Sequence, residues 1–310
     1  MRQLAPALAG RQRLTRAVRD FFLARDYLEV TTPVAVPAPA LEEHIDCPAG
    51  TNNLWLRASP ELHMKRLLAA LNRPIFQLGP CFRQNERGSL HLPEFTMLEW
   101  YRTNADCMDI LTETKALVRY CFEQVKGRQT CRFRQHHIDF SAEWRALDVA
   151  EAFVRFADLP LDRAVEQDCF EQLLVEQVLP KAGGEAPLVL HGFPLSLGAL
   201  ARKDPETDRA DRWELFAGGV ELANAYSELT DHDEQIERWQ RAAAIRRTRK
   251  MPVYPVDNNY LQLLRHGFPA CAGIALGFDR LLMVLMDKSE ISQVTPFPPE
   301  AEKVSELAPS

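Results

Sequence analysis

The sequence lacks the features that mark exported, disulfide-stabilised or membrane-embedded proteins. None of its apolar runs approaches the roughly eighteen residues that a membrane span requires. The N-terminal segment MRQLAPALAGRQRLTR has no apolar core of the signal-peptide kind, so we expect a cytoplasmic protein with no membrane association. The seven cysteines are scattered, odd in number and without a CxxC pair. This pattern predicts reduced thiols and excludes a disulfide framework or a zinc site.

The chain also lacks a basic excess, because its formal net charge is −6. We therefore expect no stable nucleic-acid binding, although a local patch can act against the overall sign. One basic cluster lies within residues 238–250 and contains Arg238, Arg241, Arg246, Arg247, Arg249 and Lys250. A solvent-exposed helix face is the favoured interpretation of this cluster, and a docking patch for an acidic partner is the alternative.

With 310 residues and 46% hydrophobic content, the chain can bury one large core or two modest ones. Internal repeats and the regular strand–helix alternation of a doubly wound fold are absent. The mixture of helices and strands predicts an α+β fold with an antiparallel sheet flanked by helices. We expect one catalytic-size domain over residues 1–300, with a helical insertion at about 145–185, and a mobile polar tail at 301–310.

Local patterns predict the individual elements. Helices are expected at 11–26, where Leu14, Val18, Phe21 and Phe22 have helical spacing, and at 108–126. Ser59 is placed as the N-cap of a further helix and Pro60 as its first residue. Residues 35–40 are expected to be loop. Strands are predicted in YLEVTTPV, LWL, HLPEFTMLEWY, PLVLHGF, WELFAGGVELANAY and CAGIALG, and as a strand pair in IFQLGPCFR.

The segment HLPEFTMLEWY, residues 91–101, has unusual chemistry for a strand. Alternation places Phe95, Glu99 and Tyr101 on one face, opposite the apolar side chains of Leu98 and Trp100. The polar face is either solvated or the floor of a pocket for a cationic group and a flat one.

Further polar residues interrupt apolar elements elsewhere. These are Ser59 and Glu61 at a helix start, Arg83 at a strand end, the set Glu214, Glu221, Asn224 and Glu228, and Arg280 just after Gly277. Each alone has a structural explanation, since paired charges occur in many sheets. Together they supply acids for Mg²⁺, arginines for phosphates and further acids for an amine. The inventory indicates nucleotide activation of a basic small molecule.

Three segments carry a family resemblance. FFLARDYLEVTTPV resembles motif 1 of the class II aminoacyl-tRNA synthetases, CFRQNERGSLHLPEFTMLEWY resembles motif 2, and GIALGFDRLLM resembles motif 3. WELFAGGVELANAYSELTD is similar to the stretch that distinguishes the lysine enzymes of the class. The resemblance covers about residues 10–298, and it implies ATP as co-substrate, Mg²⁺ and a homodimer.

The resemblance also implies roles for residues of this chain. Arg83 and Arg280 are the expected catalytic residues, on the α-phosphate and the terminal phosphate, and Glu214 and Glu221 are the metal ligands. ATP binding is expected from Arg83, Gln84, Asn85, Leu92, Phe95, Glu221, Leu222, Gly277 and Arg280. Substrate binding is expected from Ser59, Pro60, Glu61, Glu99, Tyr101, Asn224, Glu228 and Ala275. Three residues depart from the usual motif 2 pattern: Asn85 stands where an acid is usual, and Leu90 and Leu92 stand where polar groups that touch ATP are frequent.

The expected motif 1 helix begins by about residue 11, which leaves no room for an N-terminal anticodon-binding domain. On this expectation the chain resembles the elongation factor P–(R)-β-lysine ligases, which adenylate β-lysine and transfer it to a lysine of elongation factor P. Ala275 fits that family, since the lysyl-tRNA synthetases usually have glycine there. The alternatives are a tRNA-charging enzyme without its anticodon domain and a non-catalytic regulatory paralogue.

Overall fold

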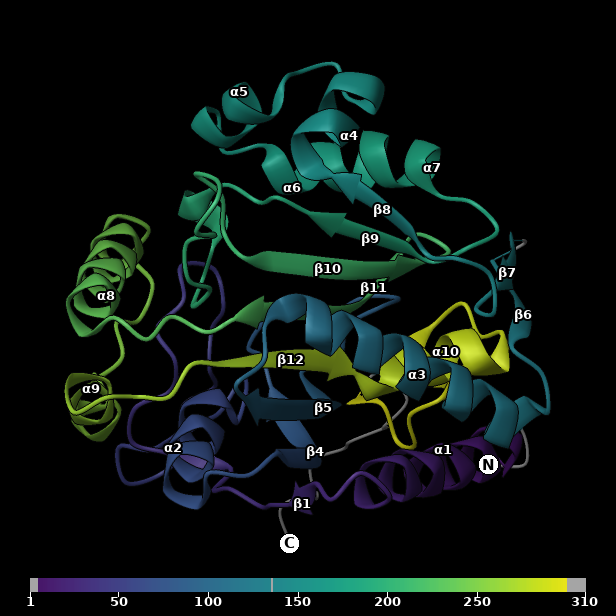
Figure 1. Cartoon of the computed structure of the whole chain (residues 1–310), viewed down its shortest axis with the longest axis horizontal. Helices are drawn as coiled ribbons and strands as arrows, with labels where there is room; N and C mark the ends of the chain where they lie inside the picture. Colours follow the sequence, from purple (N-terminus) through teal and green to yellow (C-terminus); the bar gives the residue numbers. More distant parts are fainter. Residues whose placement is uncertain (1–4, 135, 300–310) are drawn as a thin grey trace, which may run out of the picture.

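The computed structural model describes residues 5–134 and 136–299, so the tail predicted at 301–310 lies outside the described residues. An eight-stranded sheet runs through the middle of the molecule (Figure 1). In spatial order its strands are β1 (Leu28–Glu29), β4 (Ile75–Phe82), β5 (Glu94–Thr103), β12 (Cys271–Gly277), β11 (Val220–Ser227), β10 (Arg212–Ala217), β9 (Leu188–His191) and β8 (Arg145–Asp148).

The six inner strands of this sheet, from β4 to β9, are antiparallel to one another, whereas β1 pairs with β4 and β8 pairs with β9 in parallel. The prediction of an α+β fold with a helix-flanked sheet is confirmed, and the two parallel edges make the sheet mixed. Two small ribbons stand apart from it, β2 (Ala35–Val36) with β3 (Trp55–Leu56) and β6 (Thr130–Phe133) with β7 (His136–Asp139).

Helices cover one face of the sheet and its ends (Figure 1). The covering helices are α1 (Ala5–Leu23), α3 (Cys107–Lys126) and α10 (Phe278–Met286). Beyond the ends of the inner strands lie α2 (Glu61–Leu71), α8 (His232–Thr248) and α9 (Asn258–Arg265). Next to β8 and β9 lie α4 (Val149–Phe156), α5 (Leu161–Glu166), α6 (Phe170–Leu173), the π-helical turn η1 (Leu174–Val178) and α7 (Leu179–Ala182). Short turns η2 (Leu195–Leu197) and η3 (Ile291–Gln293) complete the set. Among the described helices, none is long and apolar enough to cross a membrane.

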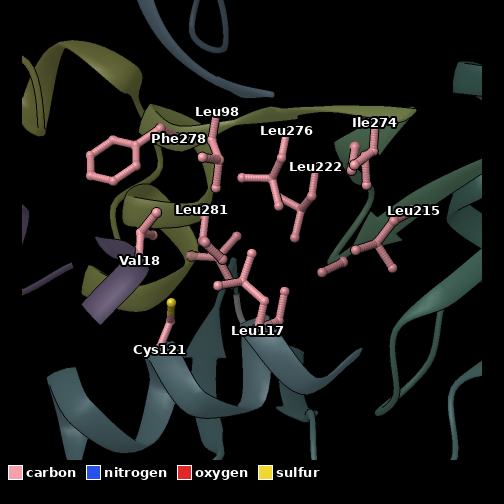
Figure 2. Packing of buried hydrophobic residues seen from close by; sticks show 14 of the residues in the cluster. Val18, Leu98, Leu117, Cys121, Leu215, Leu222, Ile274, Leu276, Phe278 and Leu281 are labelled. Atoms are coloured by element: carbon pink, nitrogen blue, oxygen red, sulfur yellow. The ribbon is translucent and has the colours of Figure 1, made fainter. Parts of the chain in front are cut away.

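The main core lies between the sheet and α1, α3 and α10 (Figure 2). Leu117 of α3 and Leu281 of α10 lie in the same fully buried cluster as Leu98 of β5 and Leu276 of β12. Each such side chain stabilises the fold by about 1.5–3 kcal/mol when removed from water. Because this core fixes one face of β5 and β12, their alternate residues are held on the opposite face, where the site lies.

The amphipathic helix predicted at 11–26 is present, but it begins and ends at other residues than predicted. Leu14, Val18 and both phenylalanines are buried, yet α1 begins at Ala5 and ends at Leu23. The chain turns at Asp26, which has a left-handed φ of 59°, and so the helix ends earlier than the apolar pattern suggested.

Two strand predictions were wrong in detail. The segment IFQLGPCFR contains one strand, β4, and not a pair. Proline is tolerated at position 80 because β4 pairs there with β5 alone, so no backbone N–H is required on the other side of the strand. The expected loop 35–40 begins with the two-residue strand β2, and the strand expected in YLEVTTPV is reduced to β1.

The range 145–185 begins with a strand of the main sheet, β8, before the helices α4 to α7 follow. The division of the chain into a catalytic domain with a helical insertion stays a prediction. The helix start at Ser59 shifts by one residue, since Pro60 is the N-cap and α2 begins at Glu61. The Ser59 hydroxyl still accepts the Glu61 N–H, at 3.0 Å.

Candidate active site

The register of the inner strands sets polar side chains side by side. Glu99 of β5 is opposite Ala275 of β12, which is opposite Asn224 of β11, which is opposite Glu214 of β10. Directly opposed residues of antiparallel strands point to the same face. A single row across four strands therefore carries residues that are up to 176 positions apart in the sequence, from Glu99 to Ala275.

A neighbouring row runs from Tyr101 through Gly273 to Tyr226. The absence of a side chain at Gly273 is required here. A Cβ atom at this position would lie 2.2 Å from a ring carbon of Tyr101 and 2.8 Å from Glu228 Oε1. The Tyr101 ring therefore packs directly on the Gly273 backbone, which any larger residue at 273 would prevent.

Glu221 reaches the same face only because β11 contains a bulge. Because Asn224 and Glu221 are three positions apart, regular alternation would place the Glu221 side chain on the opposite face of the sheet, towards the core. The pairing with β10 skips Leu222, since Leu215 pairs with Ala223 and Phe216 with Glu221. A bulge of this kind re-aims the following side chain, so Leu222 joins the core and Glu221 lines the site.

These residues line a cavity, which we call the adenylate cavity. Its wall includes Ser59 and Glu61 at the start of α2, the strand residues Phe95, Glu99, Tyr101, Glu221, Asn224, Ala275 and Gly277, and also Arg83, Leu92, Glu228 and Arg280. The sequence predicts these side chains as one site, and the fold brings them together.

One end of the adenylate cavity is a cluster of buried acids around a buried lysine. Lys65 of α2 forms ion pairs with Glu61, at 2.5 Å, and with Glu228, and its side chain is fully buried. Burial alone lowers the pKa of Lys65, but the Glu228 and Glu61 carboxylates outweigh this and hold it well above its ordinary value. The protein therefore supplies one cation of its own to this end of the cavity.

The other oxygen of Glu228 has no partner within the described residues. Oε1 is buried, and the glycine at 273 lies next to it. Burial raises the pKa of Glu228 to about 8, and the Lys65 ammonium opposes that rise. A buried acceptor without a donor is costly, so this atom points to a ligand with a cationic or N–H group.

Glu99 forms the second anionic position. The Ser59 hydroxyl donates to its Oε1 at 2.6 Å, and the Tyr101 hydroxyl donates to its Oε2 at 3.0 Å. Burial nevertheless raises the pKa of Glu99 to about 8, and these hydrogen bonds limit the rise. The lone pairs that remain on both oxygens could accept a ligand ammonium.

The opposite end of the cavity is lined by arginines and an aromatic ring. The Arg83 guanidinium lies over the Phe95 ring, 5.3 Å from its centroid, and contacts Glu86 at 3.5 Å. Arg280 donates to the Glu221 carboxylate at 3.2 Å and to His91 Nε2 at 2.7 Å. A planar ring beside two guanidinium groups suits a base and its phosphates.

Glu214 and Glu221 are the residues that could hold Mg²⁺. Burial raises the pKa of Glu214 to about 8; Arg212 opposes the rise, and the nearby Glu221 charge adds to it. Both carboxylates line a second cavity beside the adenylate cavity, where Glu214 is ion-paired with Arg212 and Glu221 with Arg280. No cluster of three or more His, Cys, Asp or Glu ligands occurs in the described ranges. Two acids plus phosphate oxygens nevertheless fit Mg²⁺, which seldom uses an all-protein site.

Four predicted site residues do not line the adenylate cavity, and one of them, Glu214, lines the second cavity beside it. Gln84 and Asn85 are exposed in the loop after β4, and Pro60 is the N-cap of α2. Leu92 and Leu222 line the cavity and are also part of the main core. The roles of all the predicted residues remain predictions.

Comparison with known proteins gives the family. The family model described as "tRNA synthetases class II (D, K and N)" matches residues 2–301. The chain belongs to the class II tRNA synthetase family. It is 36% identical to the elongation factor P–(R)-β-lysine ligase of Hamiltonella defensa, over 94% of this chain and 95% of that protein. It is 37% identical to the protein of the same name from Yersinia pestis (strain Pestoides F), over 94% of each.

Membership of the class II tRNA synthetase family implies ATP use. Two residues of the site, Lys65 and Gly273, were not predicted from the sequence. Lys65 lies four residues after Glu61, a spacing that places both side chains on one helix face. Its HMKRLL surroundings otherwise resemble an ordinary basic helix segment. Gly273 belongs to CAGIALG, where only its opposition to Tyr101 distinguishes it.

The basic cluster at 238–250 does not form a single exposed face. Arg246 is fully buried and donates to the backbone oxygens of Glu42, Ile45 and Pro252. Arg241, Arg247, Arg249 and Lys250 are exposed. The expectation of a solvated face is therefore wrong for Arg246, because its guanidinium anchors the 42–46 segment.

Proposed function

We propose that this protein activates (R)-β-lysine with ATP and transfers it to the ε-amine of a lysine on elongation factor P. The acid cluster with the unpartnered Glu228 oxygen is the observation that carries the substrate class. The names of the relatives, at 36–37% identity over nearly the whole length, support the protein acceptor.

The charges of the cavity match a diamino acid. Glu61, Glu99 and Glu228 provide three carboxylates, and Lys65 neutralises one of them. Two carboxylates remain, and each can ionise when one of the two ammonium groups of a lysine isomer binds beside it. Arg83 at the other end would hold the single carboxylate of such a substrate. A buried ammonium without such partners would face a prohibitive desolvation cost.

In the first half-reaction the substrate carboxylate attacks the α-phosphorus of ATP and pyrophosphate leaves. Arg83 would orient the carboxylate and the α-phosphate, Phe95 would stack on adenine, and Arg280 would hold the terminal phosphate. Since Arg280 contacts Glu221 in this structure, nucleotide binding is expected to replace part of that contact. Glu214 and Glu221 would hold Mg²⁺, which supplies charge neutralisation to the phosphates when bound.

We further propose a cytoplasmic homodimer. The motif 1 segment, which includes the end of α1 and β1, builds the dimer interface in the class that it resembles. Size-exclusion chromatography with light scattering tests this part separately from the catalytic proposal.

The test of the catalytic proposal is an intact-mass assay. Purified elongation factor P is incubated with this protein, ATP, Mg²⁺ and either α-lysine or (R)-β-lysine. We expect the mass increase of one lysyl residue on the factor, faster with the β isomer. A parallel reaction with tRNA and radiolabelled lysine tests the alternative. Charging of tRNA without modification of the factor would refute the proposal, and so would no pyrophosphate exchange with either isomer.

A further inference from the structure

A second, larger cavity lies beside the adenylate cavity. The two share wall residues that include Glu42, Arg83, His91, Tyr226 and Arg280. The second cavity extends to Phe170 of α6, Leu174 of η1, Leu197 and Trp239 of α8. An acceptor chain that reaches the adenylate by this route passes the shared wall, so the chemistry of the shared residues matters for transfer.

Glu42 is fixed at this junction by its backbone and not by its side chain. The buried Arg246 guanidinium donates to the Glu42 carbonyl at 2.8 Å and to the Ile45 carbonyl at 2.9 Å, and it is ion-paired with Asp46. Over residues 5–134 and 136–299, the Glu42 carboxylate itself makes no hydrogen bond or ion pair. The backbone of Glu42 is held in place by Arg246, and its side chain lines both cavities.

The other basic groups at this junction are already engaged. Arg280 can only donate, so its contact at 2.7 Å uses the lone pair of His91 Nε2 and leaves the proton on Nδ1. Glu221 accepts from the same arginine. The Tyr226 hydroxyl faces Glu61, and burial holds the pKa of that hydroxyl well above its ordinary value.

The acids of the substrate end are engaged too. Glu61 and Glu228 are paired with Lys65, and Glu99 accepts from two hydroxyls. Glu43, the neighbour of Glu42, lies within 3.8 Å of the His44 ring. Among the residues that the structure describes, Glu42 is therefore the acid on the shared wall whose carboxylate has no partner.

We propose that the Glu42 carboxylate takes the proton from the acceptor ammonium as it enters from the second cavity, which frees the amine to attack the adenylate. This inference rests on the proposed function. A lysine amine arrives protonated, because its free pKa is about 10.4, and only the neutral amine is a nucleophile. Glu42 thus fills a catalytic role that the adenylation residues leave open.

One proton of the acceptor ammonium moves to Glu42, and the nitrogen lone pair forms the new C–N bond to the acyl carbon. The bond between that carbon and the phosphate oxygen breaks, and its electron pair leaves with AMP. The second nitrogen proton leaves as the amide forms, to the departing phosphate or to water. Glu42 then returns its proton to solvent through the second cavity.

The surroundings of Glu42 suit a base that works near neutral pH. Burial is the largest influence and raises its pKa, and the Glu61 carboxylate on α2 raises it further. Arg83 after β4, Arg212 on β10 and Arg246 on α8 lower it in part. The net pKa lies above the ordinary value, which brings it closer to the range that is optimal for proton transfer.

The test compares two nucleophiles on the same adenylate. The adenylate is formed with ATP, Mg²⁺ and (R)-β-lysine, and the reaction is then split between elongation factor P and hydroxylamine. Hydroxylamine is largely uncharged at neutral pH and needs no base. We expect Glu42→Gln to lower the ratio of transfer to trapping by roughly 100-fold. Because trapping requires a folded, loaded site, misfolding lowers both rates and leaves the ratio unchanged.

Two further readouts complete the test. Glu43→Gln, the matched neighbour, should keep the wild-type ratio. Transfer by the E42Q variant should rise about tenfold per pH unit between pH 7 and 9, as neutral amine accumulates, while the wild type responds less steeply. An unchanged ratio in E42Q, an equal loss in E43Q, or the same pH slope in both proteins would overturn the inference. If the wild type traps hydroxylamine but never modifies the factor, the proposed function fails instead.

Discussion

The substitution Glu99→Gln tests the charge reasoning of the pocket directly. It keeps the size of the side chain and an oxygen that can accept the Ser59 hydroxyl, but it removes the ionisable group. Burial raises the pKa of Glu99 from 4.5 to about 8 in the folded protein. Since one pKa unit corresponds to about 1.4 kcal/mol, ionised Glu99 destabilises the ligand-free fold by up to about 5 kcal/mol.

The direction of the pH effect follows from the raised pKa. The folded protein binds the Glu99 proton more tightly than the unfolded chain does. The protonated carboxyl therefore stabilises the fold fully below about pH 4.5, and this stabilisation is lost as the pH rises towards 8. We therefore expect the E99Q variant to gain stability over the wild type by a few kcal/mol between pH 4.5 and 8.5. Urea denaturation of both proteins without ligand, at half-unit pH steps, measures the difference.

The same substitution should damage function. Without the carboxylate, the substrate ammonium loses one of its two anionic partners, and we expect the KM for β-lysine in pyrophosphate exchange to rise at least tenfold. Glu94→Gln is the matched control, because Glu94 lies on the same strand but is exposed. The reasoning is refuted if the stability difference between wild type and E99Q does not change with pH, or if E94Q shows the same pH-dependent gain.

Three further substitutions test individual contacts. Lys65→Met should destabilise the fold by about 3–5 kcal/mol in urea denaturation, because it leaves two buried acids without their cation; a loss below 1 kcal/mol would contradict the ion-pair geometry. Gly273→Ala should cost about 1–3 kcal/mol through its clash with the Tyr101 ring, seen as a lower Tm and a loss of pyrophosphate exchange. Arg246→Ala should lower stability by about 3–5 kcal/mol, whereas the exposed Arg247→Ala should change it by less than about 0.5 kcal/mol; equal effects would restore the solvated-face interpretation.

Much of the architecture was predictable because it depends on local periodicity. The spacing of Leu14, Val18 and Phe21 identified the buried face of α1, and the alternation in β5 separated Glu99 from Leu98. In both cases the pattern within one element determines which side is apolar. The order of the three motifs in the chain also predicted the family and the α+β fold.

Three features of the site depended on contacts between distant segments. Strict alternation would have placed Glu221 on the wrong face, and only the pairing of β11 with β10 creates the bulge at Leu222. Lys65 resembles a surface lysine until the fold brings Glu228 to it from 163 positions away. The Arg246 guanidinium belongs to a basic run, yet it is buried against the backbone of Glu42, 204 positions distant.

The sequence by itself determined which segments are helix or strand, which faces are apolar and which chemical groups are available. The tertiary structure alone decided which of those groups meet, which acids are already neutralised and which are left free. The physical reason is that periodicity is a property of neighbouring residues, whereas strand register and burial arise from pairing between segments far apart in the chain.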